Sequence, residues 1–211
     1  MDNIKLNILH DHYKESFLYI RNREKQRDRL FLFIIALIGI LFLEIQYAEI
    51  FPNIFKSINL ESFNLNLSTI PIFVFLSITW TYLFVLILKY CQIAIGIEKQ
   101  YEYLHILEKK ISDIFNDKEI YSREGRAYLK NYPIFSEFAW IFYVLIFPII
   151  AILSTALLLS FEWNMENTVY YHLIYDSLLV LGVALSFILY RIWSFVITIY
   201  QAMKKKVSRS K

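Results

Sequence analysis

The stretch of sequence that decides the fold runs from Ile70 to Ile97 and reads IPIFVFLSITWTYLFVLILKYCQIAIGI. Lys89 is its only charged residue. About 20 consecutive apolar residues in a helix are enough to cross the hydrocarbon core of a bilayer, so this stretch predicts a membrane-spanning helix. Spanning β-strands are instead about ten residues long and alternate in polarity, whereas this run is continuously apolar.

The whole chain shares this apolar character. Hydrophobic residues make up 57% of its 211 residues, aromatic residues 18% and charged residues 19%, and the mean hydropathy is +0.44. A typical soluble domain has about 45–50% apolar and about 25% charged residues. A soluble core of this size cannot bury the excess, so the composition predicts an all-α integral membrane protein. It also excludes a disordered chain and, with one cysteine, a disulfide scaffold.

Three further apolar runs predict three further spans, which gives four helices in two hairpins. The uncharged part of the first run, Leu30 to Leu43, is short, so this helix crosses only if it continues to about Phe51. No proline interrupts residues 72–132, and the second span is expected to continue as a long helix towards Asn116. The expected order is an amphipathic helix at 1–29, spans at 30–51, 70–97, 138–160 and 170–200, outer loops at 52–69 and 161–169, a cytoplasmic helical segment at 98–137 and a basic tail at 201–211.

The basic residues predict the orientation of these spans. Seven precede the first run, seven lie between Lys99 and Lys130, and five lie between Lys204 and Lys211. The two expected outer loops hold only Lys56. Because short cytoplasmic loops are enriched in Lys and Arg, both termini are expected inside the cell, with the chain in the inner (plasma) membrane. The clusters lie at span ends, which favours membrane anchoring over direct nucleic-acid binding.

Two acidic residues inside the expected spans, Glu44 and Asp176, are candidates for a functional role. At 1.5 Å of helix rise per residue, both lie about 9 Å inside the outer boundary of the bilayer core. Repeated around an oligomer, they would form the acidic ring of a cation-selective pore. In the alternative interpretation they lie at headgroup level, bonded to neighbours such as Tyr47, His172 or Tyr175.

Other residues of the spans have structural interpretations. Lys89 and Arg191 are expected at the cytoplasmic interface as anchors, and Pro148 is expected to kink the third span. Small residues one turn apart allow close helix contact in Ala151-x-x-x-Thr155 and in Gly182-x-x-x-Ser186. The hydroxyl groups of the second span are expected to bond mainly to their own helix: Ser77, Thr79 and Thr81.

An apolar stripe follows the second span at helical spacing, formed by Tyr101, Leu104, Leu107, Ile111 and Ile114. One interpretation is that it packs against the N-terminal helix of the same chain. The other is a coiled-coil-like contact between subunits or with a cytoplasmic partner. The stripe is too short to decide between the two.

The sequence contains no motif that indicates an enzyme. It has no glycine-rich phosphate loop, no HExxH and no cysteine pair, and Cys91 is interpreted as a small apolar residue. The alternating His10 and His12 have poor geometry for a metal. We therefore expect no catalytic site, metal or cofactor.

The plan of the chain resembles the small two- and four-span membrane effector and accessory proteins of bacterial anti-phage defence systems. The segments that carry this resemblance are Tyr13–Phe42 (YKESFLYIRNREKQRDRLFLFIIALIGILF) and Glu98–Tyr132. It implies an oligomeric inner-membrane protein that forms a pore or depolarises the membrane when a cytoplasmic partner or signal acts on it. A non-conducting scaffold that recruits a cytoplasmic partner is the competing class, and a small proton- or ion-coupled transporter is the third.

Overall fold

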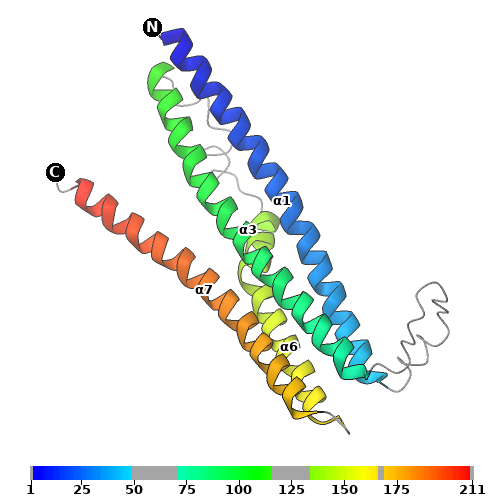
Figure 1. The fold of residues 1–211 in the computed structure, drawn as a ribbon. Coiled ribbons are helices and arrows are strands. Elements are labelled where there is room, and N and C mark those ends of the chain that lie inside the picture. The colour runs from blue at the N-terminus through cyan, green and yellow to red at the C-terminus, as the bar shows by residue number, and fades with distance from the viewer. Residues whose placement is uncertain (1, 49–70, 116–133, 166–168, 210–211) are drawn as a thin grey trace, which may run out of the picture. The chain divides into compact units, whose positions relative to one another are not determined.

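The computed structural model describes residues 2–48, 71–115, 134–165 and 169–209, and all regular structure in these ranges is helical (Figure 1). The all-α class predicted from composition is therefore confirmed for the described residues. The expected outer loop at 52–69 and residues 116–133 of the expected cytoplasmic segment lie outside them. The elements are α1 (Asp2–Gln46), α3 (Ile72–Phe115), α5 (Ile134–Ile141), the π-helical turn η3 (Phe142–Ile146), α6 (Phe147–Trp163) and α7 (Tyr170–Arg209).

Three stretches of helix are long and apolar enough to cross a membrane: Ile72–Ile114, Phe138–Trp163 and Tyr170–Ile192. They overlap the expected second, third and fourth spans over most of their lengths. The expected first span lies in α1, which is not one of the three. The helix α1 ends at Gln46, before the expected end at Phe51, so a fourth crossing stays a prediction. The orientation of the chain in the membrane also stays a prediction.

The long helices continue well beyond the apolar runs. The second helix, α3, extends without a break from Ile72 to Phe115, as the absence of proline predicts. The helix α1 joins the expected amphipathic segment and the first apolar run in one element, and α7 continues through most of the basic tail to Arg209. Helices of this length need packing partners along their whole length, because isolated helices in water are only marginally stable.

The chain divides into two compact units. Unit 1 contains residues 1–29 and 92–146, which are the N-terminal part of α1, the C-terminal part of α3, α5 and η3. Unit 2 contains residues 30–91 and 147–211, which are the C-terminal part of α1, the N-terminal part of α3, α6 and α7.

In unit 1, the N-terminal part of α1 lies alongside the C-terminal part of α3 (Figure 1). Two tyrosines connect these helices. The hydroxyl of Tyr101 donates a 2.9 Å hydrogen bond to Glu24, and that of Tyr13 donates a 3.4 Å hydrogen bond to Glu108. The buried apolar side chains in this part of unit 1 are Ile20, Leu104, Leu107 and Ile111.

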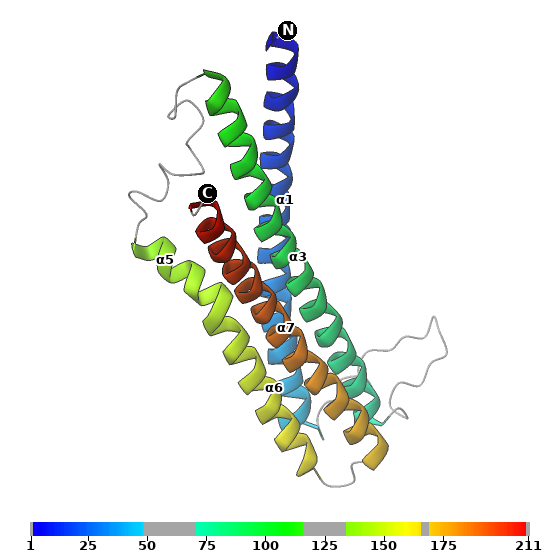
Figure 2. The same cartoon turned by 90° about the vertical axis from the view of Figure 1, so that its left-hand side faces the viewer.

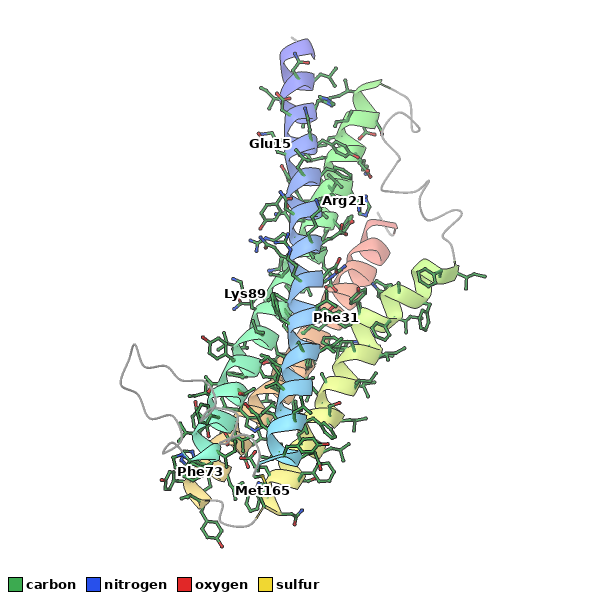
Figure 3. The ribbon with its side chains drawn as sticks, turned by 90° about the vertical axis from the view of Figure 1, so that its right-hand side faces the viewer. Glu15, Arg21, Phe31, Phe73, Lys89 and Met165 are labelled. Atoms are coloured by element: carbon green, nitrogen blue, oxygen red, sulfur yellow. The ribbon has the colours of Figure 1, made fainter. Side chains whose placement is uncertain are left out.

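In unit 2, aromatic contacts join all four helices around Phe147 of α6. Its ring centroid lies 4.7 Å from that of Phe31 in α1, 5.3 Å from that of Tyr90 in α3 and 5.9 Å from that of Phe187 in α7. Phe31 is labelled on the lower part of α1 in Figure 3, and α6 and α7 lie side by side in Figure 2. Further buried apolar residues of unit 2 are Ile34, Leu41, Leu83, Ile87, Leu158 and Val183.

The small residues of the two expected close-contact pairs are buried or tightly packed. A Cβ atom added to Gly182 would lie 2.6 Å from the Phe84 ring, so this glycine lets α3 and α7 approach closely. Ala151 and Thr155 of α6 are both fully buried. Pro148 is the second residue of α6, and the π-helical turn η3 ends two residues before it. A π-helical turn is a departure from regular α-helical hydrogen bonding, and the kink expected at Pro148 stays a prediction.

Candidate functional site

Three acidic side chains are buried inside unit 2, and each comes from a different helix. Glu44 belongs to α1, Glu162 to α6 and Asp176 to α7, and their exposed fractions are 4%, 0% and 0%. We call these three residues the carboxyl cluster. They lie near the ends of α1 and α6 and near the start of α7, which is the same end of this antiparallel set of helices.

The fourth helix of unit 2, α3, supplies the hydrogen-bond donors. The indole Nε1 of Trp80, a fully buried side chain, donates a 2.9 Å hydrogen bond to Glu162 Oε2. The hydroxyl of Ser77 donates a 3.0 Å hydrogen bond to Asp176 Oδ2, and that of Thr79 lies 3.1 Å from Glu44 Oε1. The first turns of α3 therefore supply the polar groups that contact each of the three acids.

A histidine extends this network by one step. The Ser77 hydroxyl that bonds to Asp176 also lies 3.1 Å from Nδ1 of His172, which is on the same helix as Asp176. When Ser77 donates to the carboxylate, the histidine must donate from Nδ1 to the serine oxygen. A continuous hydrogen-bonded chain then runs from His172 through Ser77 to Asp176.

The carboxyl cluster is short of donors despite these contacts. Glu44 Oε2, Glu162 Oε1 and Asp176 Oδ1 are buried and have no hydrogen-bond partner. Ser77 and Trp80 are three residues apart on α3, so their hydrogen bonds place the carboxyl groups of Asp176 and Glu162 next to each other. Two ionised carboxylates cannot bond to each other, because each is an acceptor only.

Among the described residues, His172 is the basic side chain that reaches one of these acids, Asp176, through Ser77. Within the described ranges, no Lys or Arg makes an ion pair with Glu44, Glu162 or Asp176. Nor do the described residues hold a group of three or more His, Cys, Asp or Glu side chains that could bind a metal ion. A buried charge costs several kcal/mol unless it is paired, so three ionised carboxylates at this place would strongly destabilise unit 2.

The sequence predicted part of this site. Glu44 and Asp176, expected at one depth, both belong to the carboxyl cluster. Of their expected neighbours, His172 takes part through Ser77, whereas the hydroxyl of Tyr175 lies 2.9 Å from that of Thr81 instead. The expectation that the hydroxyls of α3 bond mainly to their own helix was incomplete: Thr79 contacts both Phe75 O and Glu44, and Thr81 also donates to Ser77 O.

Two residues of the site, Glu162 and Trp80, were not predicted from the sequence. Glu162 was assigned to the outer loop, yet α6 continues to Trp163 and buries it. A signal was present in the spacing, because Ala151, Thr155, Leu158 and Glu162 continue one helical face. Trp80 carries no charge, and nothing in its sequence context distinguishes its indole from that of an ordinary core residue.

The remaining predicted residues lie apart from the carboxyl cluster. Lys89 and Arg191 are exposed, and Figure 3 shows Lys89 pointing away from the ribbon, so their role as interface anchors stays a prediction. In the stripe of unit 1, Ile114 is 41% exposed while Leu104 and Ile111 are fully buried. The Tyr101–Glu24 bond shows that this stripe packs against α1 of the same chain, and a contact between subunits stays a prediction.

No protein-family model matches this chain, and comparisons with curated proteins and with solved structures found no similar protein. A function for this chain is therefore inferred from the chemistry of the carboxyl cluster.

Proposed function

We propose that this protein is an oligomeric effector of the bacterial inner membrane that depolarises the membrane when a cytoplasmic partner or signal acts on it. Ions then cross through the helices of unit 2 and pass the carboxyl cluster. The role in anti-phage defence follows from the resemblance in plan. The observation that carries the proposal is the burial of three carboxyl groups in unit 2. Two of them, Glu162 and Asp176, belong to apolar helices of membrane length, and ionisable groups at such positions mark ion paths.

The proposed path runs within each subunit. Glu44 and Asp176 are buried inside one chain, at 4% and 0% exposed, so they are unsuited to line an axis shared by several subunits. A path through the subunit interior also passes Glu162. In a ring formed by Glu44 and Asp176 of several subunits, Glu162 would have no role. Subunit assembly then serves regulation, through the exposed faces of unit 1.

Planar-bilayer recordings of the purified protein test this function. The wild-type chain is expected to give conductance steps, and Glu44→Gln with Asp176→Asn is expected to reduce them. Glu15→Gln is the matched control, because Glu15 is an exposed acid of unit 1 (Figure 3). A chain that gives no steps at any voltage would instead be a non-conducting scaffold, and conductance unchanged in the double variant would remove the carboxyl cluster from the path.

Expression in cells provides the second test. A potential-sensitive dye is expected to report depolarisation on expression of the wild-type chain and of Glu15→Gln, and less with the double variant. Substrate-dependent movement of ions, in place of conductance, would identify a coupled transporter.

A further inference from the structure

The carboxyl cluster presents a problem of charge that its own residues do not solve. Its polar neighbours on α3 are Ser77, Thr79 and Trp80, and each of these is a neutral donor. On α7, His172 is a titratable neighbour that reaches Asp176 through Ser77, while the hydroxyl of Tyr175 contacts Thr81 instead. Even a charged His172 would balance only one of three carboxylates, so a positively charged ligand is missing.

Two ligands could supply that charge, a metal cation or a proton. A metal cation needs several oxygen or nitrogen ligands around one point. The described residues offer no such group, since the second oxygens of the three acids do not converge into a set that could hold a metal ion. A proton needs only two acceptors within hydrogen-bonding distance.

The contact between Glu162 and Asp176 meets this requirement. Each of the two acids accepts one hydrogen bond from α3 and keeps one buried oxygen without a partner. Their donors, Trp80 and Ser77, are one helical turn apart on α3, so the two carboxyl groups lie next to each other. A proton on one acid turns it into a donor, and the other acid, as an acceptor, then gains the partner that the pair lacks. Acids that share a proton in this way avoid the repulsion between two like charges.

We propose that the carboxyl cluster is a proton-binding site in which Glu162 and Asp176 share one proton. The proton adds to one carboxylate oxygen and is held between the two side chains, and no other bond forms or breaks. Glu44 is the third buried acid of unit 2, and Thr79 contacts it from α3, the helix that also bonds to the pair. The site therefore takes a proton as its ligand. That this proton is also the ion that crosses the membrane rests on the proposed function.

The chain from His172 through Ser77 gives this proton a route to the pair. His172 is partly exposed near the start of α7, whereas Asp176 is fully buried. A histidine that is accessible at one end and hydrogen-bonded at the other can pass a proton inward through a hydroxyl group. Ser77→Ala is expected to slow the exchange of the shared proton and to leave the pair itself in place.

Infrared spectroscopy of the full chain in lipid vesicles tests the site directly. A protonated carboxyl group has a carbonyl stretch that carboxylates lack and that shifts on transfer into D2O. Exposed acids ionise at pH values of about 4, so at neutral pH they give no such band. The wild-type chain is expected to show the band at neutral pH, and Glu15→Gln, which changes an exposed acid, is expected to keep it unchanged.

Two kinds of variant locate the band. Glu162→Gln is expected to abolish most of it, and Asp176→Asn is expected to shift its frequency, because the shared proton loses its second carboxyl. Trp80→Phe removes the indole donor of Glu162 without removing an acid and is expected to shift the band as well, which covers the case in which the acid variants do not fold.

The result also separates this inference from the proposed function. Absence of the band in the wild-type chain at neutral pH, or a band unchanged in all three variants, would overturn the proton site even if the protein conducts. A band that behaves as expected in a protein without conductance would leave the proton site standing and contradict the proposed function.

Discussion

The buried acids of the two units differ in whether all of their oxygens have hydrogen-bond partners. In unit 1, Glu108 is 6% exposed, and its two oxygens have separate partners, Tyr13 at 3.4 Å and His105 at 3.3 Å. In unit 2, each member of the carboxyl cluster keeps one buried oxygen without a partner, and in the part of the chain that the structure describes no other buried side-chain oxygen or nitrogen does so.

This difference distinguishes an acid that stabilises the fold, as in unit 1, from acids that form a candidate functional site, as in unit 2. A buried polar group that lacks a partner costs about 1–3 kcal/mol, so an arrangement kept only for stability would satisfy it or replace it with an apolar group. Unit 1 follows that rule, and the hydrogen bonds that join its two helices are complete within the chain. Unit 2 departs from it at one place only, among the described residues, which is where a proton or another ligand would restore the missing partners.

The largest effect is expected from the core of unit 1. Leu104→Ala removes a fully buried side chain and should lower the free energy of unfolding by about 3 kcal/mol. Thermal or denaturant unfolding in detergent measures this loss. The matched control is Leu18→Ala, since Leu18 is 53% exposed and its truncation should have little effect. Equal effects of the two variants would show that the stripe of unit 1 is not packed in the isolated chain.

A smaller effect is expected from the close approach of α3 and α7 in unit 2. Gly182→Ala places a methyl group 2.6 Å from Phe84 and should lower the free energy of unfolding by about 1–2 kcal/mol. Replacing Phe84 by Leu in the same chain should recover part of the loss.

Gly39→Ala is the control, because no atom lies within 4 Å of its added Cβ. That variant should stabilise the helix by about 0.5–1 kcal/mol, through the higher helix propensity of alanine. If Gly182→Ala stabilised the protein as Gly39→Ala does, α3 and α7 would be farther apart than the structure has them.

The smallest effects, of opposite sign, test the contrast between the units. Glu44→Met removes an unpartnered buried oxygen, while the Thr79 hydroxyl keeps its bond to Phe75 O, so the free energy of unfolding should rise by about 1 kcal/mol. Glu108→Met removes the acceptor of both Tyr13 and His105, so the same quantity should fall by about 1 kcal/mol. Effects of the same sign in both variants would break the distinction between the two units.

Much of the fold could be predicted from the sequence, because membrane-length helices depend on composition summed over about 20 residues. The uninterrupted α3 followed from the absence of proline, whereas the common depth expected for Glu44 and Asp176 in a bilayer stays a prediction. These predictions need only the rise per residue, which is the same in every α-helix.

The composition of the carboxyl cluster could not be predicted in the same way. Which residues meet depends on how each helix is rotated about its axis, and the apolar runs here are hydrophobic on all sides, so they carry little information about rotation. Glu162 was missed because α6 continues past its apolar run to Trp163. Trp80 was missed because its role comes from a single N–H group, which matters only once Glu162 is known to lie opposite.

Proton uptake by liposomes that contain the purified chain is the most direct test of the account. Valinomycin with a potassium gradient sets an inside-negative potential, and an enclosed pH-sensitive dye reports proton entry. Acidification is expected with the wild-type chain and with Glu15→Gln, and much less of it with Glu162→Gln. Acidification no faster than in protein-free liposomes, or equally fast with Glu162→Gln, would contradict a proton path through the carboxyl cluster.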